Sequence, residues 1–187
     1  ASIIGAVLFG MDQTQLIIFV IVVQITNVIG AYVLGHLVDR FGGKRSLIVS
    51  ILLMIVAIIL MFYTQTATFF FFIGALAGFA MAGMQSVSRT MVGLLSPPGQ
   101  SAEFYGFFAV AGRTSSFIGP TVYGYVAFWV ANWYQKTQGF TEIMAEQKGQ
   151  RFAILSIGIF LLIGMGILTS VKAKRAARVV PQVNTTG

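Results

Sequence analysis

The sequence predicts an all-α, polytopic transmembrane helix bundle, and two observations lead to that class. Of the 187 residues, 57% are hydrophobic and only 9% are charged, with a mean hydropathy of +0.86. Soluble domains carry about 25% charged residues, so a soluble chain this apolar could not cover its surface. The apolar residues also form long unbroken stretches, each close to or above the ~20 residues of a spanning helix and unlike the short alternating strands of a membrane barrel.

The spans are predicted in chain order within a single transmembrane domain, residues 1–187. They cover residues 15–37, 46–63, 69–95, 104–133 and 152–171. Residues 1–11 are expected to be the end of a truncated helix, residues 133–150 an outer loop, and residues 172–187 a cytoplasmic tail. The fourth span is long, and a bend is expected at Pro120, because proline removes a helical hydrogen bond.

Lysine and arginine set the expected orientation, because they favour the cytoplasmic side of short connections. Most of them fall at one set of helix ends: Arg40, Lys44, Arg45, Arg89, Lys172, Lys174, Arg175 and Arg178. The opposite ends hold Lys136, Lys148 and Arg151. We therefore expect a cytoplasmic C-terminus, and the compact loops favour a bacterial inner membrane.

Residue content argues against several other functions. With no cysteine and one histidine, the chain cannot form a disulfide, a thiolate nucleophile or a multi-histidine metal site. No carboxylates are paired within a span and no glycine-rich phosphate loop ends in lysine, so neither an enzyme nor a bound cofactor is expected. The basic residues behind the net charge of +7 lie between apolar stretches, so nucleic acid is not an expected partner.

Polar side chains inside the predicted spans are the candidate substrate-binding residues, because polar groups in a bilayer usually face a cavity or another helix. The candidates are Gln24, Asn27, Arg113 and Ser116. Helix-to-helix hydrogen bonding is the alternative for Gln24 and Asn27. For Arg113 the alternative is capping by backbone carbonyls or snorkelling toward the interface.

A second polar group lies near the cytoplasmic end of the third span, where a structural network is favoured. It comprises Gln85, Ser88, Arg89 and Glu103. We expect Arg89 to pair with Asp39 or with Glu103. The same span carries a GxxxG pair, Gly74 and Gly78, which is expected to pack helices within the chain rather than to form a special dimer face.

The first predicted cytoplasmic loop carries a recognisable motif. It reads Gly35-His36-Leu37-Val38-Asp39-Arg40-Phe41-Gly42-Gly43-Lys44-Arg45 and resembles the loop signature of the major facilitator superfamily. The resemblance implies the C-terminal six-helix half of that fold, with its first helix truncated here. It also implies a gating role for Gly35, Asp39, Arg40, Gly42, Lys44 and Arg45, whereas Gly43 departs from the commoner basic residue.

Further stretches, residues 83–89, 96–99, 103–107 and 112–120, are similar to the branch related to the fungal vacuolar amino-acid effluxers of autophagy. This resemblance implies secondary-active transport of a small solute, with amino acids as the implied class, by alternating access. The implied partners are membrane lipid and either the N-terminal half of the same transporter or a second copy. A non-transporting scaffold or assembly subunit, or a half-size protein acting as a homodimer, remains the alternative.

Overall fold

The computed structural model describes residue 5 and residues 9–170, and in this part of the chain it is helical without strands. The helices are, in order, α2 (Gln13–Phe41), α3 (Gly43–Tyr63), α4 (Ala67–Leu95), α5 (Ser101–Gln138) and α6 (Glu142–Ser170). Each predicted span lies inside one of them, up to the last described residue. The predicted cytoplasmic tail and most of the predicted truncated helix lie outside the described residues.

Local sequence explains where several helices begin and end. Asp12 caps α2: its carboxylate accepts from the Thr14 N–H, and the Gln15 side chain accepts from the Asp12 N–H at 3.2 Å. Gly42 separates α2 from α3 with a φ of 86°, which glycine adopts without a steric penalty. Gly139 ends α5 in the same way, with a φ of 63°.

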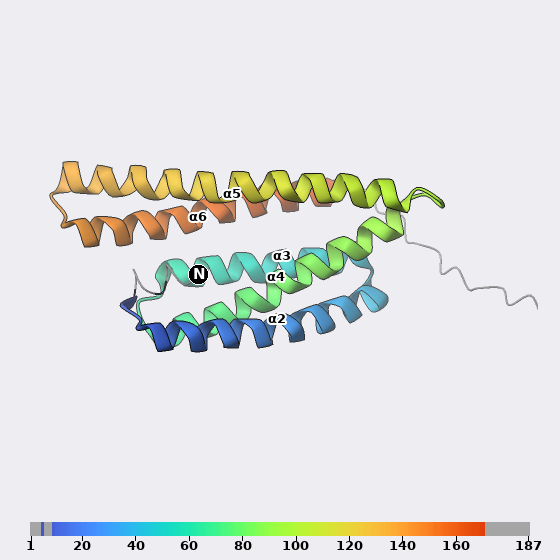
Figure 1. Ribbon diagram of the computed structural model, residues 1–187, viewed down its shortest axis with the longest axis horizontal. Coiled ribbons are helices and arrows are strands. Elements are labelled where there is room, and N and C mark those ends of the chain that lie inside the picture. Colours follow the sequence, from blue (N-terminus) through green and yellow to red (C-terminus); the bar gives the residue numbers. More distant parts are fainter. Residues whose placement is uncertain (1–4, 6–8, 171–187) are drawn as a thin grey trace, which may run out of the picture.

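The helices are arranged in two layers (Figure 1). α4 packs against α2 and α3 in one layer, and α5 and α6 form an antiparallel hairpin in the other. α6 joins the layers by packing on α3, whereas α5 meets α4 near the turn that connects them. The described part of the chain therefore consists of a three-helix layer and a hairpin that runs alongside it (Figure 1).

Glycines allow α2 and α4 to approach closely. A Cβ on Gly30 would lie 2.3 Å from the Phe79 carbonyl oxygen, and one on Gly78 would lie 2.9 Å from a backbone oxygen of α2. A Cβ on Gly74 would overlap the ring of Phe19. The GxxxG pair therefore serves packing within the chain, which confirms the prediction.

Cations on α3 and α6 cap each other's C-termini. Arg151 of α6 donates to the carbonyl oxygens of Phe62 and Thr64, at 2.8 and 2.9 Å. At the opposite end of the pair, Lys44 Nζ of α3 donates to the Thr169 carbonyl oxygen of α6 at 2.8 Å. The last carbonyls of a helix have no partner within the helix and attract positive charge, so these contacts fix the two helices at both ends.

The predicted long connection at residues 133–150 is wrong, because only residues 139–141 separate α5 from α6. α5 continues to Gln138, and α6 begins at Glu142. α5 is also assigned as one continuous helix through Pro120, where a bend was expected. The segment is polar, but polarity excludes it from hydrocarbon rather than from a helix, and its alanine, glutamine, glutamate and lysine residues are good helix formers.

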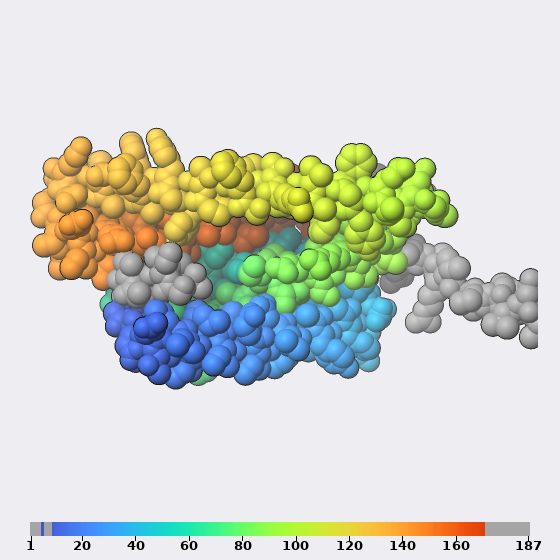
Figure 2. All heavy atoms as spheres, in the orientation of Figure 1, coloured from blue at the N-terminus to red at the C-terminus, as the bar shows by residue number. Residues whose placement is uncertain are grey.

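Four helices, α2, α3, α4 and α6, are long and apolar enough to cross a membrane by length and composition. Their outward faces carry exposed apolar side chains such as Phe72 of α4, which is 70% exposed. α5 is not among the four, although a span was predicted there. It is about 57 Å long by the rise of a helix, and none of its residues is buried in the described part of the chain. Figure 2 shows α5 as an uncovered ridge above α4.

Candidate functional site: a polar groove between α2 and α4

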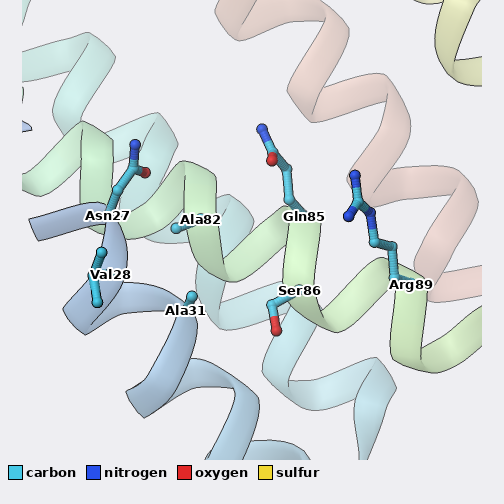
Figure 3. A pocket seen from close by; sticks show the side chains of 7 residues that line it. All are labelled: Asn27, Val28, Ala31, Ala82, Gln85, Ser86 and Arg89. Carbon is cyan, nitrogen blue, oxygen red and sulfur yellow. The ribbon is translucent and has the colours of Figure 1, made fainter. Parts of the chain in front are cut away.

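An open groove between α2 and α4 gathers polar side chains from both helices (Figure 3). Its volume is about 510 Å³. The lining consists of Asn27, Val28, Ala31, Ala82, Gln85, Ser86 and Arg89. Small apolar side chains form the floor between the helices, and the longer polar ones project from it.

Helical spacing explains why the α4 residues meet here. Ala82, Gln85, Ser86 and Arg89 follow one another at intervals of three, one and three residues, so they share one face of α4. Gly35 of α2 lies against this face, where an added Cβ would be 3.3 Å from Ser86 Oγ. Sequence reasoning did not single out Ser86 as a site residue, although the same periodicity would have found it.

Asn27 is half-buried in the lining, whereas Gln24 is exposed and lies outside it. The Asn27 amide donates to Gln24 Oε1 at 3.1 Å, one turn away on the same helix. This bond orients the Asn27 amide at the groove. The structure thus brings one of the two α2 candidates into the site and makes the other its hydrogen-bond partner.

Arg89 projects its guanidinium on the same side of the groove as the amides of Asn27 and Gln85 (Figure 3). Its backbone carbonyl accepts a 3.0 Å hydrogen bond from the Tyr105 hydroxyl, which ties α5 to α4 at this level. The predicted pairing with Asp39 or Glu103 is wrong, because among the described residues no salt bridge joins Arg89 to either carboxylate.

The other members of the predicted network do not line the groove. Ser88 donates to the Gln85 carbonyl oxygen at 3.2 Å on its own helix, and Glu103 lies in the first turn of α5. Arg113 and Ser116 are also on α5, where Ser116 donates to the Arg113 carbonyl oxygen at 2.7 Å. Both are exposed and outside the groove lining. The described helices therefore do not gather all four substrate candidates around one site.

The predicted gating residues occupy the junction of α2 and α3. His36 Nδ1 lies 3.9 Å from the Asp39 carboxylate within α2, and Arg40 is in the last turn of that helix. Gly42 forms the one-residue break, and Arg45 lies in the first turn of α3. The motif is thus a tight corner between two helices, at the same end of the bundle as the Lys44 cap.

The charge of the groove lining is positive. Among its residues Arg89 is charged and none is acidic, while amide and hydroxyl groups supply both donors and acceptors. Within the described residues, no cluster of histidine, aspartate or glutamate could hold a metal ion. Chemically, the groove is suited to an anionic group flanked by hydrogen-bonding groups.

Comparison with known proteins gives consistent matches over the chain. A family described as "Vacuole effluxer Atg22 like" matches residues 1–180. The "Uncharacterized MFS-type transporter YxiO" of Bacillus subtilis (strain 168) is 25% identical over 176 residues, which are 94% of this chain and 37% of that protein. Autophagy-related protein 22-1 of Aspergillus fumigatus is 33% identical over 106 residues, or 56% of this chain and 15% of its own length.

A shorter match of 52 residues, 28% of this chain, is 42% identical to Autophagy-related protein 22 of Botryotinia fuckeliana and covers 9% of that protein. No solved structure matches the chain significantly. The chain spans little more than a third of the length of the Bacillus relative and a smaller share of the fungal ones.

Proposed function

The chain belongs to the Atg22-like vacuole effluxer family, a branch of the major facilitator transporters, and from this premise we propose that it is the C-terminal half of a secondary-active transporter for a small solute. In this proposal the transporter works by alternating access, and amino acids are its solute class. The polar groove between α2 and α4 is the observation that carries the proposal.

The groove suits an amino acid because its groups match both ends of that solute. The Arg89 guanidinium can bind a carboxylate through two parallel N–H donors. The amide oxygens of Asn27 and Gln85 can accept from an ammonium group, and Val28 and Ala31 provide an apolar wall for a side chain. Arg89 is exposed and has no salt bridge within the described residues, so it is free for a ligand.

We propose the N-terminal half of the same transporter, or a second copy, as the partner that covers α5. Four glycines of α5 support this: an added Cβ on any of them would meet no atom within 4 Å beyond its own helix. They are Gly106, Gly112, Gly119 and Gly124. Arg113 and Ser116 would then face the partner, whose acidic group would neutralise the guanidinium.

The corner between α2 and α3 is proposed to control closure of one side of the cavity. The proposal is supported by the short connection, because Gly42 is the one residue between α2 and α3. A movement of α2 would therefore be transmitted directly to α3. The proposal puts this corner, and the C-terminus with it, on the cytoplasmic side of a bacterial inner membrane. The basic residues at the corner support the cytoplasmic side.

The test is counterflow exchange by the full-length transporter in liposomes, with a radiolabelled amino-acid mixture outside and unlabelled amino acids inside. The Arg89→Gln variant should reduce uptake at low solute concentration about tenfold or more, because it removes a charged hydrogen-bonding partner of the carboxylate. Ser88→Ala is the matched control, since Ser88 is adjacent but lies outside the groove lining.

The two parts of the proposal fail separately. If the wild-type protein does not exchange any amino acid, the solute class is wrong. If it does exchange them and Arg89→Gln behaves like Ser88→Ala, the groove is not the binding site.

A further inference from the structure

A second, apolar hollow lies at the corner of α2 and α3, on a different surface from the polar groove. It has a volume of about 390 Å³ and its lining includes Leu37 and Phe41 of α2 and Arg45, Ile48 and Val49 of α3. It shares no lining residue with the groove between α2 and α4. Arg45 brings a positive charge to a hollow whose other walls are mainly hydrocarbon.

An apolar track continues from this hollow along α3. Val49, Leu52, Val56 and Ile59 follow Arg45 at intervals of four, three, four and three residues, so they lie on one helix face. Each of the four is between 38% and 48% exposed. The track extends about 21 Å along the helix from Arg45. It is therefore longer than the hydrocarbon of one bilayer leaflet, which is roughly 15 Å thick.

The charge at the head of the track is available to a ligand. Arg45 is exposed, and within the described residues its side chain makes no hydrogen bond or salt bridge. Arg40 and Lys44 add positive charge to the same corner. The carboxylate of Asp39, six residues before Arg45, lies 3.9 Å from His36 Nδ1 on α2.

We propose that this corner binds an anionic phospholipid, with its phosphate at Arg45 and one acyl chain along Val49 to Ile59. Charge complementarity selects the anionic headgroup, and the apolar track requires a ligand that carries hydrocarbon. This site does not depend on the solute proposed for the polar groove.

Native mass spectrometry of the full chain in mild detergent tests the site, with phosphatidylglycerol and phosphatidylcholine of identical acyl chains as probes. Wild type should prefer phosphatidylglycerol, and Arg45→Gln should weaken that binding about fivefold. Arg45→Lys should retain the preference. Lys136→Gln, which removes an exposed charge on α5, should also leave it unchanged.

A second variant tests the acyl track without changing charge. Val49→Trp fills the hollow and should weaken phosphatidylglycerol binding, with helical content by circular dichroism as the folding check. Soluble glycerol phosphate should not compete with the lipid. Equal binding of the two lipids, an Arg45→Gln variant that binds like wild type, or full competition by glycerol phosphate would each overturn the proposal.

Discussion

At the scale of single residues, the contrast between Arg89 and Arg151 shows that tertiary contacts decide what an arginine does. Arg151 uses two donors on the carbonyls of Phe62 and Thr64, so its charge stabilises the end of a neighbouring helix. Arg89 makes no such contact with its side chain, which points into an open groove. The first is therefore a structural cation and the second is available to a ligand.

Arg151→Met should lower the free energy of unfolding by about 1.5–3 kcal/mol, because it leaves the carbonyls of Phe62 in α3 and of the C-cap Thr64 without their charged donor. The measurement is an SDS titration followed by circular dichroism. Lys148→Met, an exposed position on the same helix, is the control and should change stability little. Similar losses in both variants would show that the cap does not stabilise the α3–α6 pair.

At the scale of helices, two pairs are held by close backbone contact. α2 and α4 meet through Gly30 and Gly78. In the α5–α6 hairpin, a Cβ on Gly149 would lie 2.3 Å from the Ala127 carbonyl oxygen, and the Tyr123 hydroxyl donates to Gln150. Such contacts leave little room for adjustment, so each pair is expected to move as a unit.

Gly30→Ala should destabilise the bundle by about 1–3 kcal/mol, because the new methyl group would overlap the backbone of Phe79. The same SDS titration measures the loss. Gly164→Ala on α6 is matched in chemistry but has open space around the position, so it should be neutral or slightly stabilising. Equal stability of the two variants would contradict the close α2–α4 contact.

At the scale of the whole molecule, α5 is the surface that the described helices leave incomplete. It has no buried residue, carries the charged Arg113, and exposes apolar rings such as Phe117 at 75%. A charged side chain beside glycines that no described helix covers fits the partner bundle proposed for this face. This surface is where the proposed partner half would dock.

In the full-length transporter, Gly112→Leu should reduce uptake about tenfold or more while membrane abundance stays normal, because the larger side chain would hold the partner bundle away from α5. Uptake in liposomes and immunoblotting of membranes measure the two quantities. Gly164→Leu, on an open face of α6, is the control. Normal uptake by Gly112→Leu would show that no bundle packs at this position.

The sequence by itself determined the helical class and the positions of the apolar stretches. The hydrophobicity of a segment depends only on its own residues, and an apolar segment inside a bilayer must satisfy its backbone hydrogen bonds internally, as a helix does. It also contained the GxxxG pair, whose packing role follows from its spacing, and the loop motif, whose gating role is implied only by the resemblance to the major facilitator signature. Asn27, Gln85 and Arg89 could be selected as polar residues within spans. Their assignment to one groove could not, because it depends on how α2 and α4 lie against each other.

Only the tertiary structure decided which polar groups meet. Arg151 lies 89 residues from Phe62 and Lys44 lies 125 residues from Thr169, so no local pattern predicts these caps. Arg89 likewise makes no salt bridge with Asp39 or Glu103 within the described helices, an outcome that residue spacing does not predict. Hydrogen-bond partners in a helix bundle are set by packing geometry, whereas hydropathy sets only which segments are helices in the membrane.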